Sequence, residues 1–244
     1  MMMEHAIDVE NLNIKYKSIQ SYSLKQSLLK MRTVQSRTVH AVKDVTFSVN
    51  KGEVVGIVGK NGSGKSTMLT AIAGIFSPDS GTIDVHGNTV SLLSIGTGFK
   101  GDVTGRENLM LNGLLLGFSE KEIREKADSI IEFSELGKFI DMPVNTYSSG
   151  MRSKLAFSIA VNLETDIILV DEILSVGDSR FRVKSYQKMR ELIKDENRTV
   201  MIVSHQENTL RTLCDRILWL DEGTLRMYDK ADVVLDAYTE YMKG

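Results

Sequence analysis

The chain has 244 residues, of which 42% are hydrophobic and 25% charged, so it is long enough to bury one α/β core. Its 30 basic and 32 acidic residues give a formal charge of -2, which argues against a general nucleic-acid-binding protein. Cys214 is the only cysteine, which excludes an internal disulfide and a cysteine metal cluster. We expect it to be a buried structural residue.

The sequence contains no signal-peptide pattern and no run of about 18 apolar residues of the kind that crosses a membrane. It therefore predicts a cytosolic protein that touches a membrane only peripherally.

Residues 7–16 and 39–49 alternate apolar and polar positions, which predicts half-buried antiparallel strands. The segment 15–43 carries seven Lys or Arg and no Asp or Glu. Within it, helical spacing would place four apolar side chains near one face, with basic residues around them: Leu24, Leu28, Leu29, Met31, Lys25, Lys30 and Arg32. Two interpretations stay open, a basic amphipathic helix that meets a membrane or partner, and a solvated basic surface segment.

Further along, the apolar run EVVGIVG after Gly52 predicts a strand covered on both faces. We also predict helices over 66–75, 120–139 and 151–163, and buried strands over 166–170 and 199–203. This alternation indicates an α/β fold with a parallel sheet and crossover helices.

The turn after the first buried strand fits the phosphate-binding pattern G-x-x-x-x-G-K-[ST]. A chance glycine-rich turn is the alternative, but the strand before and the helix after favour a phosphate loop. Lys65 is expected to neutralise the β- and γ-phosphates of ATP, and the Ser66 hydroxyl to ligate Mg²⁺. The candidate nucleotide-binding residues of this loop are Gly59, Asn61, Gly62, Ser63, Gly64, Lys65, Ser66 and Thr67.

A second motif, DIILVDE, ends a buried strand with two adjacent carboxylates. Ligands of open α/β sheets bind at the carboxyl ends of the strands. Asp171 is therefore expected to hold the Mg²⁺ shell, and Glu172 to orient or deprotonate the attacking water. His205 lies at the end of the next such strand, near the expected γ-phosphate. Its position favours a catalytic role, and the alternative is a structural hydrogen bond.

The order of these motifs, with YSSGM at 147–151 and SVGD at 175–178 between them, resembles an ABC transporter nucleotide-binding subunit over nearly the whole chain. The resemblance implies a single domain, 1–244, with a P-loop NTPase core, an antiparallel β subdomain, a helical subdomain at about 100–162 and a basic insertion at about 17–38. It implies that Ser148, Ser149, Gly150 and Asp178 act in trans on ATP held by a second copy. Tyr16 matches the aromatic that stacks on adenine, with Tyr22 as a competitor.

Finer features resemble the branch that exports lipid-linked polysaccharides such as O-antigens, capsules and teichoic acids. They are YSSGMRSKLAFSIA, LSIGTGFKGDVTGRENLMLNG, VDEILSVGDSRF and the insertion before HAVKDVTF. This resemblance implies a peripheral ATP hydrolase at the cytoplasmic face of the cell membrane, in the short form that lacks a C-terminal glycan-binding domain. Its expected cofactors are ATP and Mg²⁺, and its expected partners are a second copy, a separate multi-span permease and a lipid-linked glycan, without nucleic acid. The alternatives are an ABC ATPase of another transporter type and a soluble ABC ATPase.

Two positions depart from the usual family pattern. The glutamine that commonly senses Mg²⁺ and the membrane partner is absent, and its equivalent place is near Ser94 and Ile95. Ser149 replaces the first glycine of the signature, where the backbone can still donate to phosphate.

Overall fold

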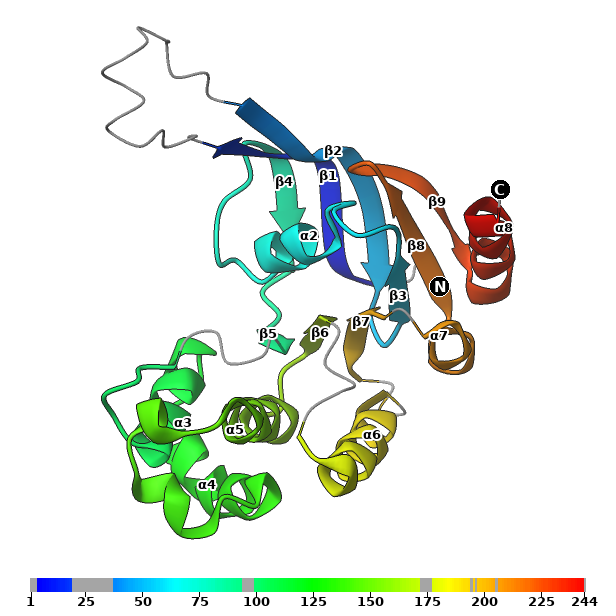
Figure 1. Cartoon of the computed structure of the whole chain (residues 1–244). Coiled ribbons are helices and arrows are strands. Elements are labelled where there is room, and N and C mark those ends of the chain that lie inside the picture. Colours follow the sequence, from blue (N-terminus) through cyan, green and yellow to red (C-terminus); the bar gives the residue numbers. More distant parts are fainter. Residues whose placement is uncertain are drawn as a thin grey trace, which may run out of the picture.

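Two sheets and a separate group of helices make up the chain (Figure 1), and the computed structural model describes residues 4–18, 37–93, 99–171, 177–193, 195, 197–204 and 206–243. The first sheet is antiparallel and has the order β2-β1-β4, with β1 at His5–Ser18, β2 at Arg37–Asn50 and β4 at Ser80–Asp84. The two predicted N-terminal strands are thus confirmed. The amphipathic helix considered for the basic segment lies outside the described residues.

The second sheet has six strands in the order β5-β6-β7-β3-β8-β9. Five of them run parallel, and only the edge strand β9 is antiparallel to its neighbour. The strands are β3 at Val54–Val58, β5 at Val90–Leu93, β6 at Ile167–Asp171, β7 at Thr199–Val203, β8 at Arg216–Asp221 and β9 at Thr224–Lys230. Their order places β3 and β7 side by side in the centre, so the loops that follow both strands meet at one edge.

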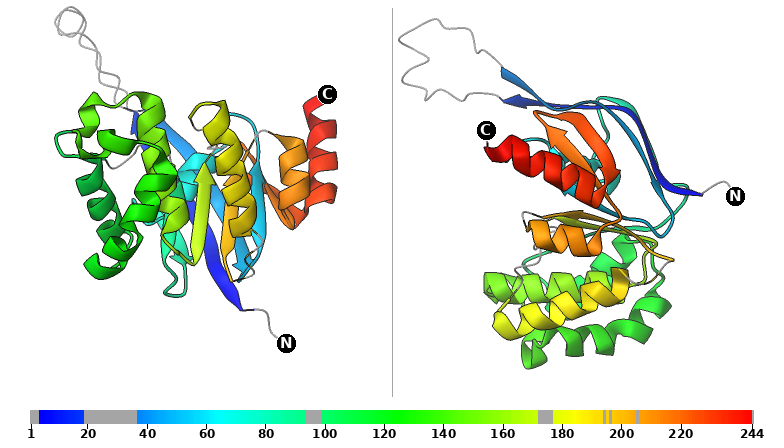
Figure 2. Two further views of the ribbon diagram at one scale, coloured as in Figure 1. Left: turned by 90° about the horizontal axis from the view of Figure 1, so that it is seen from below. Right: turned by 90° about the vertical axis from the view of Figure 1, so that its right-hand side faces the viewer.

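Both faces of this parallel sheet are buried, as its continuous apolar runs predict. Ile167 and Leu169 pack toward the first sheet and the helix α2, Lys65–Ile72, whereas Ile168 and Val170 pack on the opposite face. That face is covered by helices, among them α6 at Ser179–Ile193, α7 at Glu207–Leu213 and α8 at Ala231–Lys243. Figure 2 shows α7 and α8 at the same end of the molecule.

A group of helices on the far side of the sheet has a core of its own, with buried residues such as Leu109, Ile123 and Leu155. It contains α3 at Gly105–Leu115, α4 at Glu120–Ser134, two short 3₁₀ turns at Gly137–Asp141 and Val144–Thr146, and α5 at Ser149–Asn162. These elements lie within the range predicted for a helical subdomain; its boundaries stay a prediction.

Two predicted helices end earlier than expected. The helix predicted to reach residue 139 ends at Ser134, because Glu135 and Gly137 adopt positive φ angles of 56° and 53°. The helix predicted for 66–75 ends at Ile72, just before Gly74 with φ 71°. In both cases a left-handed residue stops the helix, and in the first case a non-glycine adopts that conformation.

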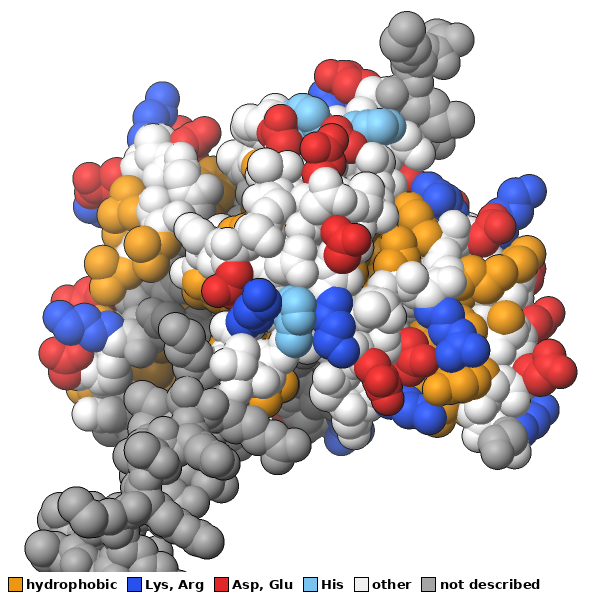
Figure 3. All heavy atoms as spheres, turned by 90° about the horizontal axis from the view of Figure 1, so that it is seen from above, with side chains coloured by type: hydrophobic (Ala, Val, Ile, Leu, Met, Phe, Trp, Pro, Cys, Tyr) orange, Lys and Arg blue, Asp and Glu red, His pale blue; other side chains and the backbone are white. Residues whose placement is uncertain are grey.

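Cys214 is buried as expected, and burial raises the pKa of its thiol to about 12. The face shown in Figure 3 intersperses acidic and basic side chains. Within the described part of the chain, no helix has the length and apolar character needed to cross a membrane.

Candidate nucleotide site

The phosphate loop joins the fully buried strand β3 to the helix α2. Its glycines 59, 62 and 64 all have positive φ angles, of 149°, 81° and 99°. At Gly64 an added Cβ would lie 2.3 Å from the carbonyl oxygen of Ala41. The loop therefore wraps tightly, and at this position only glycine fits without strain.

The side chain of Lys65 is buried and lies across the loop. Its Nζ donates hydrogen bonds to the carbonyl oxygens of Gly59, at 2.8 Å, and Lys60, at 2.9 Å. The helix that begins at Lys65 is capped by Gly64, without a side-chain hydrogen bond to its first turn. Backbone N–H groups at the start of α2 and the Lys65 ammonium together favour an anion.

A cavity of about 470 Å³ opens in front of this loop. It gathers residues from five segments that are distant in the sequence. Its lining residues are Tyr16, Ala41, Asn61, Gly62, Gly64, Lys65, Ser66, Thr67, Asp171 and Val203. The structure thus places Tyr16, most of the phosphate loop and Asp171 around one space.

Two predicted loop residues do not line this cavity. Ser63 is buried inside the loop, and its Oγ has no hydrogen-bond partner among the described residues. Gly59 packs against the backbone of Leu220, since an added Cβ would lie 2.2 Å from that carbonyl oxygen. These two residues pack inside the loop and against β8, and not toward the cavity.

The acidic side of the cavity is formed by Asp171, which ends β6 and pairs with Val203 of β7. Glu172 follows β6 directly and His205 follows β7 after Ser204, and both lie outside the described residues. The Ser66 hydroxyl and the Asp171 carboxylate both line the cavity, and oxygen atoms of this kind are the ligands that Mg²⁺ prefers. The donor set therefore fits a magnesium ion held by two side chains together with phosphate and water.

The YSSGM signature occupies a different part of the chain. Ser148 caps α5, because its Oγ accepts a hydrogen bond from the Met151 N–H at 3.2 Å. Ser148 and Ser149 are exposed, whereas Tyr147 is buried and donates from its hydroxyl to the Phe139 carbonyl at 2.5 Å. Among the described residues, the cavity lining contains none of this signature, and α5 lies with the separate helical group (Figure 1). Ser148, Ser149 and Gly150 are therefore not part of the cavity in front of the phosphate loop of their own chain.

Asp178 is held by contacts within its own chain. Its carboxylate lies 2.7 Å from Lys154 Nζ of α5 and accepts hydrogen bonds from the N–H groups of Arg180 and Phe181. The Lys154 ammonium is the main reason that the pKa of Asp178 is lowered to about 2. Asp178 therefore fixes the start of α6 to the helix that carries the signature.

Sequence reasoning missed two residues of the cavity wall, Ala41 and Val203. Val203 directly precedes the predicted motif Ser204-His205, so its place was available from the sequence. Ala41 lies in the predicted strand 39–49, but its place against Gly64 of the loop joins two segments that no local pattern relates. The expected glutamine equivalents, Ser94 and Ile95, and the competitor Tyr22 lie outside the described residues.

Comparison with known proteins gives a consistent result. The model of the ABC transporter family matches residues 42–175. An O-antigen export system ATP-binding protein, RfbB of Klebsiella pneumoniae, is 43% identical over 209 residues, which cover 86% of this chain and 85% of the relative.

A teichoic acids export ATP-binding protein, TagH of Lactococcus lactis subsp. lactis (strain IL1403), is 40% identical over 97% of this chain. The chain spans about half of that relative, 51% of its length. Among solved structures, the ATP-binding cassette MJ0796, determined as a dimer bound to ADP and Pi, superposes with a TM-score of 0.73. The superposition covers 92% of this chain and 98% of the MJ0796 chain. The two sequences are 24% identical, so the similarity supports the fold alone.

Proposed function

This chain belongs to the ABC transporter family, and from that premise we propose that it is the ATP-hydrolysing subunit of an exporter that moves lipid-linked polysaccharide across the cell membrane. The observation that carries the cargo class is the similarity, over nearly the whole chain, to subunits named for O-antigen and for teichoic acid export. The observation that carries the chemistry is the cavity in front of the phosphate loop.

ATP binds in this proposal with its adenine against Tyr16, which is 45% exposed at the mouth of the cavity. Its β- and γ-phosphates lie on the loop and beside the Lys65 ammonium. When bound there, Mg²⁺ offsets the phosphate charge, with Ser66 and Asp171 as its protein ligands. Glu172 then orients or deprotonates the water that attacks the γ-phosphate, and His205 contacts that phosphate.

The site is completed by a second copy of the chain. Ser148, Ser149 and Gly150 lie at an exposed helix N-terminus, which favours contact with phosphate from outside the chain. We assign Asp178 to the same interface, where it holds the start of α6 against the signature helix. ATP joins the two copies, and hydrolysis releases them.

A membrane subunit is the expected partner, and the helix α3 offers a surface for it. Leu111, Leu114 and Leu115 follow one another at helical spacing, and their side chains are 41%, 48% and 79% exposed. A stripe of exposed leucines on one helix marks a protein interaction site better than scattered apolar residues do. We assign this stripe to contact with the permease at the cytoplasmic face of the membrane.

Isolation of the tagged chain from its host in mild detergent, followed by mass spectrometry, tests this proposal. We expect a multi-span membrane protein and a lipid-linked glycan to accompany the chain. A matched variant with Leu111, Leu114 and Leu115 replaced by Ser is expected to lose the membrane protein and keep ATP binding. Recovery of ribosomes, DNA or only soluble partners would contradict the export function and leave the ATPase chemistry in place.

A further inference from the structure

The C-terminal helix α8 contacts the phosphate loop through one aromatic residue. The Nζ of Lys60, the second residue of the loop, lies 4.6 Å from the centre of the Tyr241 ring. An ammonium at this distance from an aromatic ring is attracted by its π electrons. We infer that Tyr241 is a positioning residue for ATP binding, which fixes the phosphate loop through Lys60.

Lys60 is well placed to transmit such a restraint. Its carbonyl oxygen accepts hydrogen bonds from the Lys65 ammonium, at 2.9 Å, and from the Ser63 N–H, at 3.1 Å. The backbone of this residue thus holds the lysine assigned to the phosphates, while its side chain reaches α8. The side-chain contact with α8 and the backbone contacts with Lys65 and Ser63 thus meet at one residue.

The Tyr241 ring is itself firmly held. The Arg226 guanidinium lies 4.3 Å from the ring centre, and the Trp219 ring is 5.2 Å away. The Tyr241 hydroxyl lies 3.3 Å from Asp221 Oδ2, which also pairs with Arg226 at 2.9 Å. Lys60 therefore meets an aromatic ring whose position is set by the strands β8 and β9.

The other anchor of α8 lies on α7, the helix that follows the end of β7. Arg211 of α7 pairs with Asp232 and Asp236 of α8, and Glu207 accepts a hydrogen bond from the Thr239 hydroxyl at 3.0 Å. The helix α8 thus contacts both the phosphate loop and α7.

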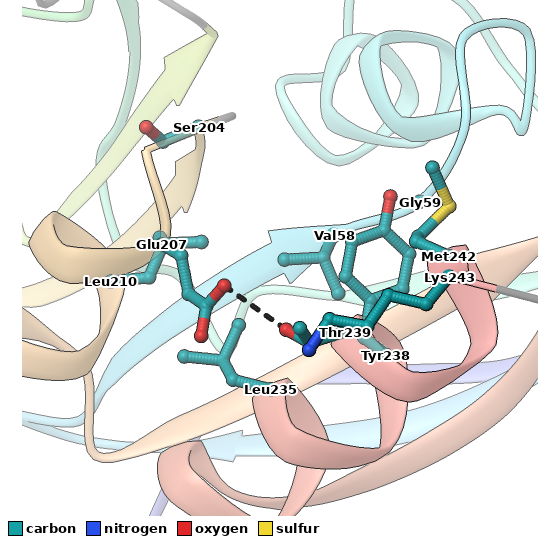
Figure 4. A pocket seen from close by; sticks show the side chains of 10 residues that line it. All are labelled: Val58, Gly59, Ser204, Glu207, Leu210, Leu235, Tyr238, Thr239, Met242 and Lys243. Atoms are coloured by element: carbon teal, nitrogen blue, oxygen red, sulfur yellow. Dashed lines mark hydrogen bonds between the residues drawn. The ribbon is translucent and has the colours of Figure 1, made fainter.

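Between these two anchors α8 is separated from the loop by a cavity of about 330 Å³. Gly59, Ser204 and Glu207 line it together with Tyr238 and Met242 of α8 (Figure 4). This space interrupts the packing, and the contact of Tyr241 with Lys60 joins the helix to the loop beside it. A loop that is held in shape before ATP arrives loses less conformational freedom on binding.

This inference rests on the proposed nucleotide site, and it predicts a uniform effect on ATP and ADP. The full-length variants Tyr241→Leu and Lys60→Met are each expected to weaken ADP binding by about two- to fivefold, the scale of one exposed cation–π contact. The KM for ATP should rise by the same factor while kcat is unchanged, because the contact acts before and during the reaction alike. Isothermal titration with ADP and steady-state ATPase kinetics measure the two quantities.

Three comparisons make the test specific. Tyr241→Phe keeps the ring and should bind ADP like the unaltered chain, and the double variant Lys60→Met with Tyr241→Leu should be no weaker than either single variant. Asp236→Asn loosens α8 from α7 and should lower the melting temperature without changing ADP affinity. Since Lys60 is exposed, its replacement tests the contact even if Tyr241→Leu unfolds α8.

The inference is overturned if Lys60→Met binds ADP as tightly as the unaltered chain, if Tyr241→Phe loses as much affinity as Tyr241→Leu, or if the losses multiply in the double variant. Failure of the unaltered chain to bind ADP would instead overturn the nucleotide site itself, and this inference with it.

Discussion

At the scale of single residues, the phosphate loop depends on the absence of a side chain at Gly64. Replacement by Ala would force an L residue into φ 99° and bring a Cβ to 2.3 Å from the Ala41 carbonyl. We expect Gly64→Ala to lower the free energy of unfolding by about 2 kcal/mol or more, because left-handed strain and a backbone clash add.

Gly62→Ala is the matched control. Gly62 also has a positive φ, of 81°, but an added Cβ there meets no atom within 4 Å. Gly62→Ala should lower the free energy of unfolding by ~1 kcal/mol, because only the backbone strain contributes. Urea unfolding of both variants measures the difference, and equal losses would show that the close approach to Ala41 contributes nothing.

Much of the cavity could be predicted at this scale, and the reason is the order of the motifs. The loop at 59–67 and Asp171 each sit at the end of a buried strand, and parallel strands bring such ends together. Ala41 and the contact between Lys60 and Tyr241 could not be predicted, because they join segments that no local pattern relates. Tyr16 came from the family resemblance, and the structure places it at the cavity.

At the scale of elements, Ser148 serves α5 as a helix cap, and we assign it a second role toward the partner's ATP. Ser148→Ala removes the bond from its Oγ to the Met151 N–H and should cost about 1 kcal/mol of stability, with a loss of turnover. Ser148→Asp caps the helix as well as Ser does and should keep that stability. Its negative charge would face the γ-phosphate, so ATP hydrolysis should still be lost.

Urea unfolding and ATPase assays of the two variants separate these roles. A Ser148→Asp variant that hydrolyses ATP at the normal rate would rule out the contact of Ser148 with phosphate.

The stability that the contact between α5 and α6 contributes should depend on pH, because Asp178 forms part of that contact. Its pKa is lowered to about 2 in the folded chain, against an ordinary value of 3.8, mainly by Lys154. The stabilisation is therefore complete above the ordinary value and is lost as the pH falls toward the folded value. Asp178→Asn should be less stable than the unaltered chain at neutral pH, and the gap should narrow between about pH 4 and pH 2.

Urea midpoints of both chains across this range provide the measurement. A gap that stays constant from neutral pH to about pH 2.5 would show that the ion pair does not stabilise the fold.

Element boundaries were less predictable than element types. The predicted strands β3, β6 and β7 have the expected range within a residue or two, since buried parallel strands are marked by short apolar runs. The helix α4 ends at Ser134 rather than residue 139, because Glu135 turns left-handed without being a glycine. The helices α3, α6, α7 and α8 were not predicted, and α8 turned out to contact the phosphate loop.

At the scale of the whole molecule, the two halves of the proposed catalytic site belong to different parts of one chain, and the signature does not line the cavity at the phosphate loop. The phosphate loop lies between the two sheets, and the signature lies at an exposed end of the helical group (Figure 1). The proposed mechanism therefore requires two copies, and it requires a separate membrane subunit to turn ATP hydrolysis into transport. The sequence indicated both partners only through resemblance, since the packing of the helical group depends on contacts between distant segments.

The central claim is that ATP hydrolysis by this chain drives export of a lipid-linked glycan. The most direct test is to replace the gene in its host by the Glu172→Gln variant and to measure the glycan at the cell surface and the lipid-linked glycan inside. Loss of a general base slows turnover by about 10²-fold or more. We predict that surface glycan falls while lipid-linked glycan accumulates inside, at an unchanged amount of the protein. Normal surface glycan in a strain whose purified Glu172→Gln chain binds but does not hydrolyse ATP would contradict the claim.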